Sequence, residues 1–343
     1  MYKRNILCLL EKTAKLCLFG LIVVMPFVGF SQQEPQFTQY MFNRLSYNPA
    51  YAGSNGAICL TAFNRNQWMG LKLNDIKGNP STPTTFNASI DLPISFLHGG
   101  LGATVISENI GYWNQVFLKL DYAYRFELPT GNLALGLEAQ MFNSSIDFAN
   151  LVASDQIDEL DRIGATKDPI LRDASQQNDF LFDLGFGIYY QVPGKFYAGL
   201  SSSKLMETES KKLKWADQRH YYILAGYEWT IPAYPSFRVL PSALVKLVEP
   251  DEIGFINYQI DATALLEYNY MFWGGLNYRI DDAISVLGGL SIAGFKLGLA
   301  YDIPATSKIA RKSYGSFELF LRYCFKIENQ PKPPTSYRNT RRN

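Results

Sequence analysis

Two histidines are the only imidazole side chains that this sequence offers for acid–base or nucleophilic chemistry. His98 lies in a predicted turn, and His220 begins a predicted strand. A serine hydrolase needs a serine nucleophile that such a histidine activates, and no nucleophile motif accompanies either residue. We therefore expect both histidines at a surface or an interface, and we predict that the protein is not an enzyme.

Two long predicted loops carry clustered charge that could bind a metal or a partner. The acidic cluster comprises Asp155, Asp158, Glu159, Asp161 and Asp168, and the basic one Lys204, Lys211, Lys212 and Lys214. Carboxylates are Ca²⁺ ligands, but their spacing does not match an EF-hand loop, so we predict solvated charge without metal or other cofactor. The opposite charges could attract each other or bind a protein partner, and the sequence leaves both readings open.

The elements between these loops follow a two-residue period. From Val116 to Phe126 every second residue is apolar, and the residues between are mostly polar or charged. The pattern resumes from Leu133 to Met141 after the turn 129–131. Side chains alternate between the two faces of a strand, so this stretch predicts a β-hairpin with one apolar face.

Such a hairpin fits either a soluble β-sandwich or an outer-membrane β-barrel, and the length of its arms separates the two. Strands of globular proteins usually have about five or six residues, whereas a tilted strand that crosses a bilayer needs roughly nine to eleven. The arms here are long. We therefore predict an all-β, antiparallel, up-and-down transmembrane barrel of the outer membrane, with its apolar face toward lipid.

The remainder of the chain repeats this pattern in about fourteen predicted strands, the even number expected of a bacterial barrel. Besides the hairpin they span 57–68, 84–92, 101–108, 180–191, 195–201, 220–229, 237–248, 256–268, 271–280, 283–292, 295–302 and 315–326. Long and short connections alternate, as they do between external loops and periplasmic turns. The order of this alternation, counted from the first strand, predicts that both chain termini are periplasmic.

Composition agrees with a membrane barrel more than with an enzyme. The chain has 23 Phe and 22 Tyr but only 2 His, and its 32 basic and 31 acidic residues give no strong field toward nucleic acid. We expect Trp68, Trp113, Trp229 and Trp273, which lie near predicted strand ends, at the lipid interface, or alternatively in an ordinary core.

Both ends of the chain differ from the barrel. Basic residues followed by the apolar run 16–30 predict a signal peptide, residues 1–31, cleaved near Ser31, with an uncleaved anchor helix as the alternative. Residues 32–56 show no periodicity but are too aromatic for a free tail, so we expect a periplasmic or plug-like segment at the mouth or in the lumen. Residues 57–326 form the barrel, and the Pro-rich basic stretch 327–343 predicts a periplasmic tail.

Closure of the barrel would bring two cysteines, one in the first strand and one in the last, close together. Cys59 lies early in the first strand and Cys324 late in the last, and both have the parity of inward-facing charged neighbours. They should approach each other at the periplasmic end. A disulfide between them is a candidate in that oxidising compartment.

The same parity places a mixed set of charges in the lumen. It comprises Lys119, Asp121, Arg125, Glu127, Glu138, Asp183, Lys195, Lys246, Asp261, Arg279, Lys296, Glu318 and Arg322. A balanced lumen favours paired charges and a packed or plugged interior over an ion-selective pore. In the hairpin we expect an ion pair between Arg125 and Glu138, and we attribute the strand glycines to tapering and bending of the barrel.

The segment before the first strand carries the most specific sequence signal, PQFTQYMFN at 35–43 and YNPAYAGS at 47–54, followed by NRNQWMG at 64–70. With HYYILAGYEW at 220–229, LPSALVK at 240–246, FWGGLNYR at 272–279 and LGLAYD at 297–302, these blocks resemble the PorP/SprF-type outer-membrane proteins. The residues of the N-terminal motif are Pro35, Gln36, Phe37, Gln39, Tyr40, Asn43, Tyr47, Asn48, Pro49, Ala50, Tyr51 and Gly53.

This resemblance implies a role in Bacteroidetes type IX secretion and gliding. The expected partners are outer-membrane lipid and either secretion components or an exported adhesin-like cargo with a C-terminal secretion domain. From the barrel topology we expect the long loops 151–179 and 202–218 to contact this cargo. The alternative from a different class is a porin-like channel for small solutes, with the N-terminal segment as its constriction.

Overall fold

The computed structural model describes residues 34–71, 82–111, 113–146, 177–210, 215–216, 218–249, 257–305 and 312–326. Three predictions lie outside these residues: the signal peptide, the acidic cluster with Asp155, Asp158, Glu159 and Asp161, and the basic tail. Lys211, Lys212 and Lys214 also lie outside them. Among the described residues, no helix is long and apolar enough to span a membrane.

The described chain forms one antiparallel sheet of 15 strands, of which all but the two-residue strand β11 are long. The long strands are Ala57–Met69 (β1), Thr84–Ile94 (β2), Gly99–Ile110 (β3), Trp113–Leu128 (β4), Gly131–Ile146 (β5), Gln177–Val192 (β6), Phe196–Ser203 (β7), His220–Tyr227 (β10), Phe237–Val248 (β12), Asn257–Tyr268 (β13), Phe272–Arg279 (β14), Ala283–Ile292 (β15), Phe295–Pro304 (β16) and Gly315–Lys326 (β17). The prediction of fourteen long strands is confirmed.

The short elements lie in the connections and before β1. They are the 3₁₀ turns Tyr40–Phe42 (η1), Pro49–Tyr51 (η2) and Ser95–Leu97 (η3), the helix Arg44–Tyr47 (α2), and the strands Glu209–Ser210 (β8), Trp215–Ala216 (β9) and Trp229–Thr230 (β11). Strand β8 pairs only with β9 in a separate two-stranded sheet. Elements this short show no period in the sequence, and only Trp229 of β11 lies within a predicted strand, 220–229.

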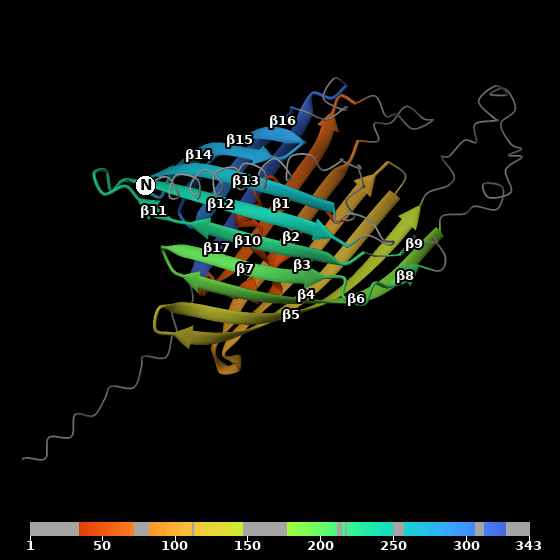
Figure 1. Ribbon diagram of the computed structural model, residues 1–343, viewed down its shortest axis with the longest axis horizontal. Helices are drawn as coiled ribbons and strands as arrows, with labels where there is room; N and C mark the ends of the chain where they lie inside the picture. Colours follow the sequence, from red (N-terminus) through yellow and green to blue (C-terminus); the bar gives the residue numbers. More distant parts are fainter. Residues whose placement is uncertain are drawn as a thin grey trace, which may run out of the picture. The chain divides into compact units, whose positions relative to one another are not determined.

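Two pairings close the sheet into a barrel. Strand β17 pairs with β1, in a register that places Lys326 opposite Ala57. Strand β10 pairs with β12, with His220 opposite Val248. Every long strand therefore has two neighbours, and within the described residues no long sheet edge remains for pairing with another chain. Figure 1 shows these strands side by side and tilted around an enclosed space.

Burial along the strands identifies the two faces of the wall. On β4 the side chains of Phe117, Lys119 and Asp121 are buried, whereas those of Val116 and Leu120 are each 46% exposed. Charged residues therefore point into the barrel and apolar residues point out of it, the reverse of a soluble protein. This arrangement confirms the outer-membrane barrel and excludes the soluble sandwich.

Connection lengths distinguish the two ends of the barrel. At one end, three residues or fewer join β4 to β5, β6 to β7, β13 to β14 and β15 to β16. At the other end lie most of the long connections, which include 70–83, 147–176, 204–219, 249–256 and 305–314. We call these the short-turn end and the long-loop end. Strand β1 begins and β17 ends at the short-turn end.

Candidate functional site

The candidate site is the barrel lumen, because residues 34–56 of the chain lie inside it. We call these residues the lumen segment. Its side chains Phe37, Tyr40, Ala50 and Ala52 are at most 1% exposed. Three short turns, η1, α2 and η2, fold the segment, and the side chain of Asn48 accepts a hydrogen bond from the backbone N–H of Ala50 at 2.9 Å. In Figure 1 the lumen segment is drawn in red and runs between the strands.

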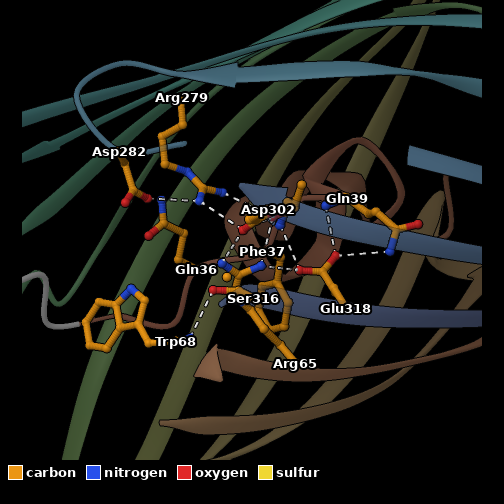
Figure 2. Close-up of polar contacts among 12 residues, drawn as sticks. Gln36, Phe37, Gln39, Arg65, Trp68, Arg279, Asp282, Asp302, Ser316 and Glu318 are labelled. Atoms are coloured by element: carbon orange, nitrogen blue, oxygen red, sulfur yellow. Dashed lines mark hydrogen bonds and ion pairs between the residues drawn. The ribbon is translucent and has the colours of Figure 1, made fainter. Parts of the chain in front are cut away.

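The first half of the lumen segment is bound to carboxylates of the barrel wall. Thr38 donates through its hydroxyl to Asp302 at 2.8 Å and through its backbone N–H to Glu318 at 2.8 Å. The backbone N–H of Gln39 also donates to Glu318, at 2.9 Å. Figure 2 shows Asp302 and Glu318 pointing toward this part of the segment from neighbouring strands.

Two arginines from opposite sides of Asp302 complete this network. Arg65 lies 2.6 Å from Asp302 and 3.1 Å from Glu318, and Arg279 lies 2.8 Å from Asp261 and 3.4 Å from Asp302. Both guanidinium groups also donate to the hydroxyl of Thr38, at 2.8 and 3.3 Å. The lumen segment is therefore part of the charge network (Figure 2).

Because this network is buried, breaking one of its ion pairs would cost considerable folding free energy. The side chains of Arg65, Arg279, Asp261 and Glu318 are at most 2% exposed. Removal of one partner from a buried ion pair typically costs about 3–5 kcal/mol, because the other charge is left without compensation. The network thus fixes the position of the lumen segment.

A second cluster holds the beginning of the lumen segment. Glu34 accepts hydrogen bonds from Ser203 at 2.9 Å and from the hydroxyl of Tyr222, and it lies 3.9 Å from Lys119. Lys119 also lies 3.5 Å from Glu138, so its amine is shared between the two buried carboxylates.

The second half of the segment packs on wall glycines. Asn48 donates to the backbone carbonyls of Ile188 and Leu200 at 3.0 and 3.2 Å. A β-carbon at Gly136 would lie 2.5 Å from the Cα of Ala50, and one at Gly199 would lie 2.7 Å from Nδ2 of Asn48. Side chains at these two positions would overlap the turn formed by Asn48, Pro49 and Ala50. Contact with this turn explains the glycines more directly than the predicted tapering and bending of the barrel.

The segment leaves the lumen at the short-turn end. Arg125 donates to the carbonyls of Ala52 and Gly53 at 2.9 and 3.2 Å, and Asn55 donates to Asp91 at 3.2 Å just before β1. Glu34, in contrast, binds at the level of Ser203, the last residue of β7, toward the long-loop end. Of the two expectations for this segment, periplasmic or plug-like, the contacts of its described residues with the inner wall favour the plug-like one.

Several predicted lumen contacts differ in the structure. Strands β4 and β5 pair with Leu128 opposite Gly131, which places Arg125 opposite Ala134 and far along the ladder from Glu138. The predicted ion pair of Arg125 with Glu138 is wrong, because Glu138 pairs with Lys119 at 3.5 Å. Of the other predicted lumen charges, Glu127 and Lys195 are exposed at the short-turn end.

Three residues that we expected at surfaces are buried. His220 is 2% exposed, and its Nδ1 lies 2.7 Å from the carbonyl of Gln218. Lys204, expected in an exposed basic loop, is 1% exposed, with its amine 5.8 Å from the centre of the Phe142 ring. Trp273, expected at the lipid interface, faces the lumen and packs 4.9 Å from Phe42. Strand parity alone could have placed Trp273, because it shares the face of Arg279.

The two cysteines lie where closure predicted them. Cys59 and Cys324 are opposite each other in the β1–β17 ladder, with 4.1 Å between their Cα atoms, and their sulfurs are joined. Cys59 is fully buried. The bridge fastens the first strand to the last near the short-turn end.

The site offers little room for chemistry. Within the described residues, no group of three metal-ligating side chains could hold an ion. A cavity between Glu34, Tyr47, Ile106, Lys119 and Gln140 has about 10 Å³, which is about the space of one water molecule. This cavity is too small for an organic substrate.

Comparison with known proteins supports both the fold and a family. A family model for the type IX secretion system membrane protein PorP/SprF matches residues 29–323. No curated protein matches the chain. Among solved structures, the CymD monoaromatic hydrocarbon channel has 12% identity and a TM-score of 0.50, over 88% of this chain and 96% of its own.

Two further solved structures are outer-membrane proteins of similar extent. The Pseudomonas putida toluene transporter TodX has 8% identity and a TM-score of 0.45, over 82% of this chain and 93% of its own. The Acinetobacter baumannii outer membrane protein Omp33 has 7% identity and a TM-score of 0.42, over 78% of this chain and 99% of its own. At such identities the similarity to CymD shows the fold alone.

Proposed function

Because the chain belongs to the PorP/SprF family of type IX secretion system membrane proteins, we propose that it is a non-enzymatic outer-membrane barrel that anchors or assists a secreted surface protein. The partner would be an exported protein with a C-terminal secretion domain, components of the secretion machinery, or both. Histidine geometry supports the absence of catalysis, since His220 is buried against a backbone carbonyl and His98 lies in an exposed turn.

The observation that carries this proposal is the occupied lumen. A solute channel with about fourteen strands needs an open interior, which a barrel of this size has room for. Here the network of Arg65, Arg279 and Asp302 binds the chain's own Thr38 across that interior. A barrel that is filled in this way is suited to holding other proteins at the membrane more than to passing solutes.

We assign the short-turn end to the periplasm and the long-loop end to the cell surface, because outer-membrane barrels have short periplasmic turns and longer external loops. In this orientation the C-terminal tail after Lys326 is periplasmic. The predicted partner-binding charges, Asp155, Asp158, Glu159, Asp161, Lys204, Lys211, Lys212 and Lys214, belong to connections of the surface end. Of these, the buried Lys204 is the least suited to contact a partner.

Affinity purification tests this proposal. A tagged copy is purified from the native outer membrane in mild detergent, and the proteins that accompany it are identified. We expect a large exported surface protein or secretion components at near-stoichiometric level. A variant with Asp155, Asp158, Glu159 and Asp161 changed to amides should retain less cargo, because the surface loop loses its charge.

The matched control is Glu127→Gln, which neutralises an exposed carboxylate at the opposite end of the barrel. It should retain the partner at the native level. A native barrel that purifies alone would contradict the anchor proposal and favour the solute channel.

A further inference from the structure

Two inward-facing cations lie directly opposite each other at the short-turn end. Lys296 of β16 pairs with Arg322 of β17, and each side chain is partly exposed at the mouth of the lumen. Like charges that are cross-strand neighbours repel each other and destabilise a sheet. A pair of this kind needs a compensating negative charge.

The described residues supply no such charge within ion-pair distance. Glu267 is the carboxylate that interacts most strongly with Lys296, and Asp91 interacts with Arg322, but neither forms an ion pair with these cations, and each has a nearer partner. Glu267 binds Arg238 at 2.6 Å, and Asp91 accepts from Asn55 at 3.2 Å. Towards the long-loop end, in contrast, Arg65, Arg279 and Lys119 each have carboxylates within 4 Å.

Hydrogen-bond donors around this pair lack acceptors. Arg322 donates through Nε to Thr61 and through Nη2 to the carbonyl of Phe42, and its Nη1 makes no further bond with the described residues. The Nε1–H of Trp273 is buried and has no acceptor among them. The Lys296 amine lies 4.3 Å from the centre of the Phe42 ring and 5.8 Å from that of Trp273.

We propose that Lys296, Arg322 and Trp273 form a binding site for a small oxyanion, a carboxylate or phosphate group, at the short-turn mouth of the lumen. The two cations provide charge-assisted hydrogen bonds, and the indole N–H provides a neutral donor. Because these side chains point inward, the ligand is a group that enters the mouth and not the headgroup of a surrounding lipid. This site is independent of the proposed secretion partner.

Titration calorimetry of the full chain in detergent tests the site. The probes are inorganic phosphate and an acetylated tri-aspartate peptide, at constant ionic strength. We expect both to bind the native protein, Lys296→Gln to weaken binding at least tenfold, and the double variant with Arg322→Gln to abolish it. Trp273→Phe keeps an aromatic ring but removes the donor, so it should weaken binding severalfold.

Lys195→Gln is the matched control, because it removes an exposed cation of the same end that lies outside the lumen. It should bind both probes as the native protein does. Binding of phosphate but not of the peptide identifies a free oxyanion as the ligand, and binding of both identifies a chain carboxylate. Absence of binding to the native protein, or equal binding by the double variant, would overturn the proposal.

Thermal unfolding separates this role from a structural one. Without anion, Lys296→Gln should unfold at the native temperature or above it, because the substitution removes the repulsion of Arg322. Phosphate should stabilise the native protein more than the Lys296→Gln variant and leave the double variant unchanged, since a ligand that binds only the folded state shifts unfolding by mass action. A variant that is less stable without anion would contradict the inference.

Discussion

At the scale of single residues, Thr38 is the position on which the lumen network converges. Its hydroxyl donates to Asp302 and accepts from Arg65 and Arg279, which come from strands β1 and β14. A lumen segment without this hydroxyl would leave both arginines with one acceptor fewer in a buried site. The wall charges therefore hold the segment, and the segment in turn satisfies the wall charges.

Arg65→Gln tests this network. The substitution leaves Glu318 and Asp302 with less positive charge in a site that is nearly closed to solvent. We expect a loss of roughly 3–5 kcal/mol in the free energy of unfolding. Unfolding by denaturant, followed through the heat-modifiable migration of the barrel, measures it.

Arg219→Gln is the control, because this arginine pairs with Glu207 and Glu249 near the surface, where an ion pair contributes at most about 1 kcal/mol. If the two variants lost the same stability, the buried network would not be what fixes the segment.

At the scale of elements, the sequence predicted the strands well and the lumen segment poorly. The two-residue period marks a strand because each residue alternates between lipid and lumen, so Phe237–Val248 and Ala283–Ile292 were predicted to the residue. The lumen segment has no period, because the wall surrounds it on every side. Its burial was predictable from its aromatic residues, but its path was not.

The register between paired strands was predictable only where particular residues indicated which positions face each other. Cys59 and Cys324 indicated the register of closure, whereas the β4–β5 hairpin lacked such a mark. There the turn has two residues instead of the expected three, and Arg125 lies opposite Ala134, four positions along the ladder from Glu138. A three-residue turn would also have left the two residues three positions apart, so the predicted ion pair was wrong in either register.

Gly136→Ala tests whether the wall glycines hold the lumen segment. The new methyl group would overlap the backbone of Ala50, so the segment must shift while the outward face of the barrel stays unchanged. We expect faster proteolysis within residues 34–56 of the variant in detergent. Gly288→Ala is the control, since the nearest atom to its β-carbon would be 3.8 Å away, and its proteolysis should equal that of the native protein.

Thiol counting tests the fastening of β1 to β17. The predicted mature chain retains only Cys59 and Cys324, because Cys8 and Cys17 lie within the predicted signal peptide. We expect no reactive thiol in the denatured protein without reductant and two after reduction. Two reactive thiols before reduction would rule out the bridge.

At the scale of the whole molecule, the lumen segment, residues 34–56, occupies the interior of the barrel. Glu34 binds toward the long-loop end and Asn55 at the short-turn end, so the segment spans most of the lumen between them. Toward the long-loop end, Arg65, Arg279 and Lys119 are paired with wall carboxylates, and the first two also bind the segment. The chain belongs to the PorP/SprF family, and the occupied lumen supports our proposal that the barrel holds secretion partners.

Conductance across a planar lipid bilayer tests the closed lumen most directly. The purified full chain is inserted at low protein density, and single-insertion currents are recorded over a range of voltages. We predict insertion without a steady conductance, because the network around Thr38 holds the segment in the lumen. A steady, large conductance from the native protein would contradict the account and make it a solute channel.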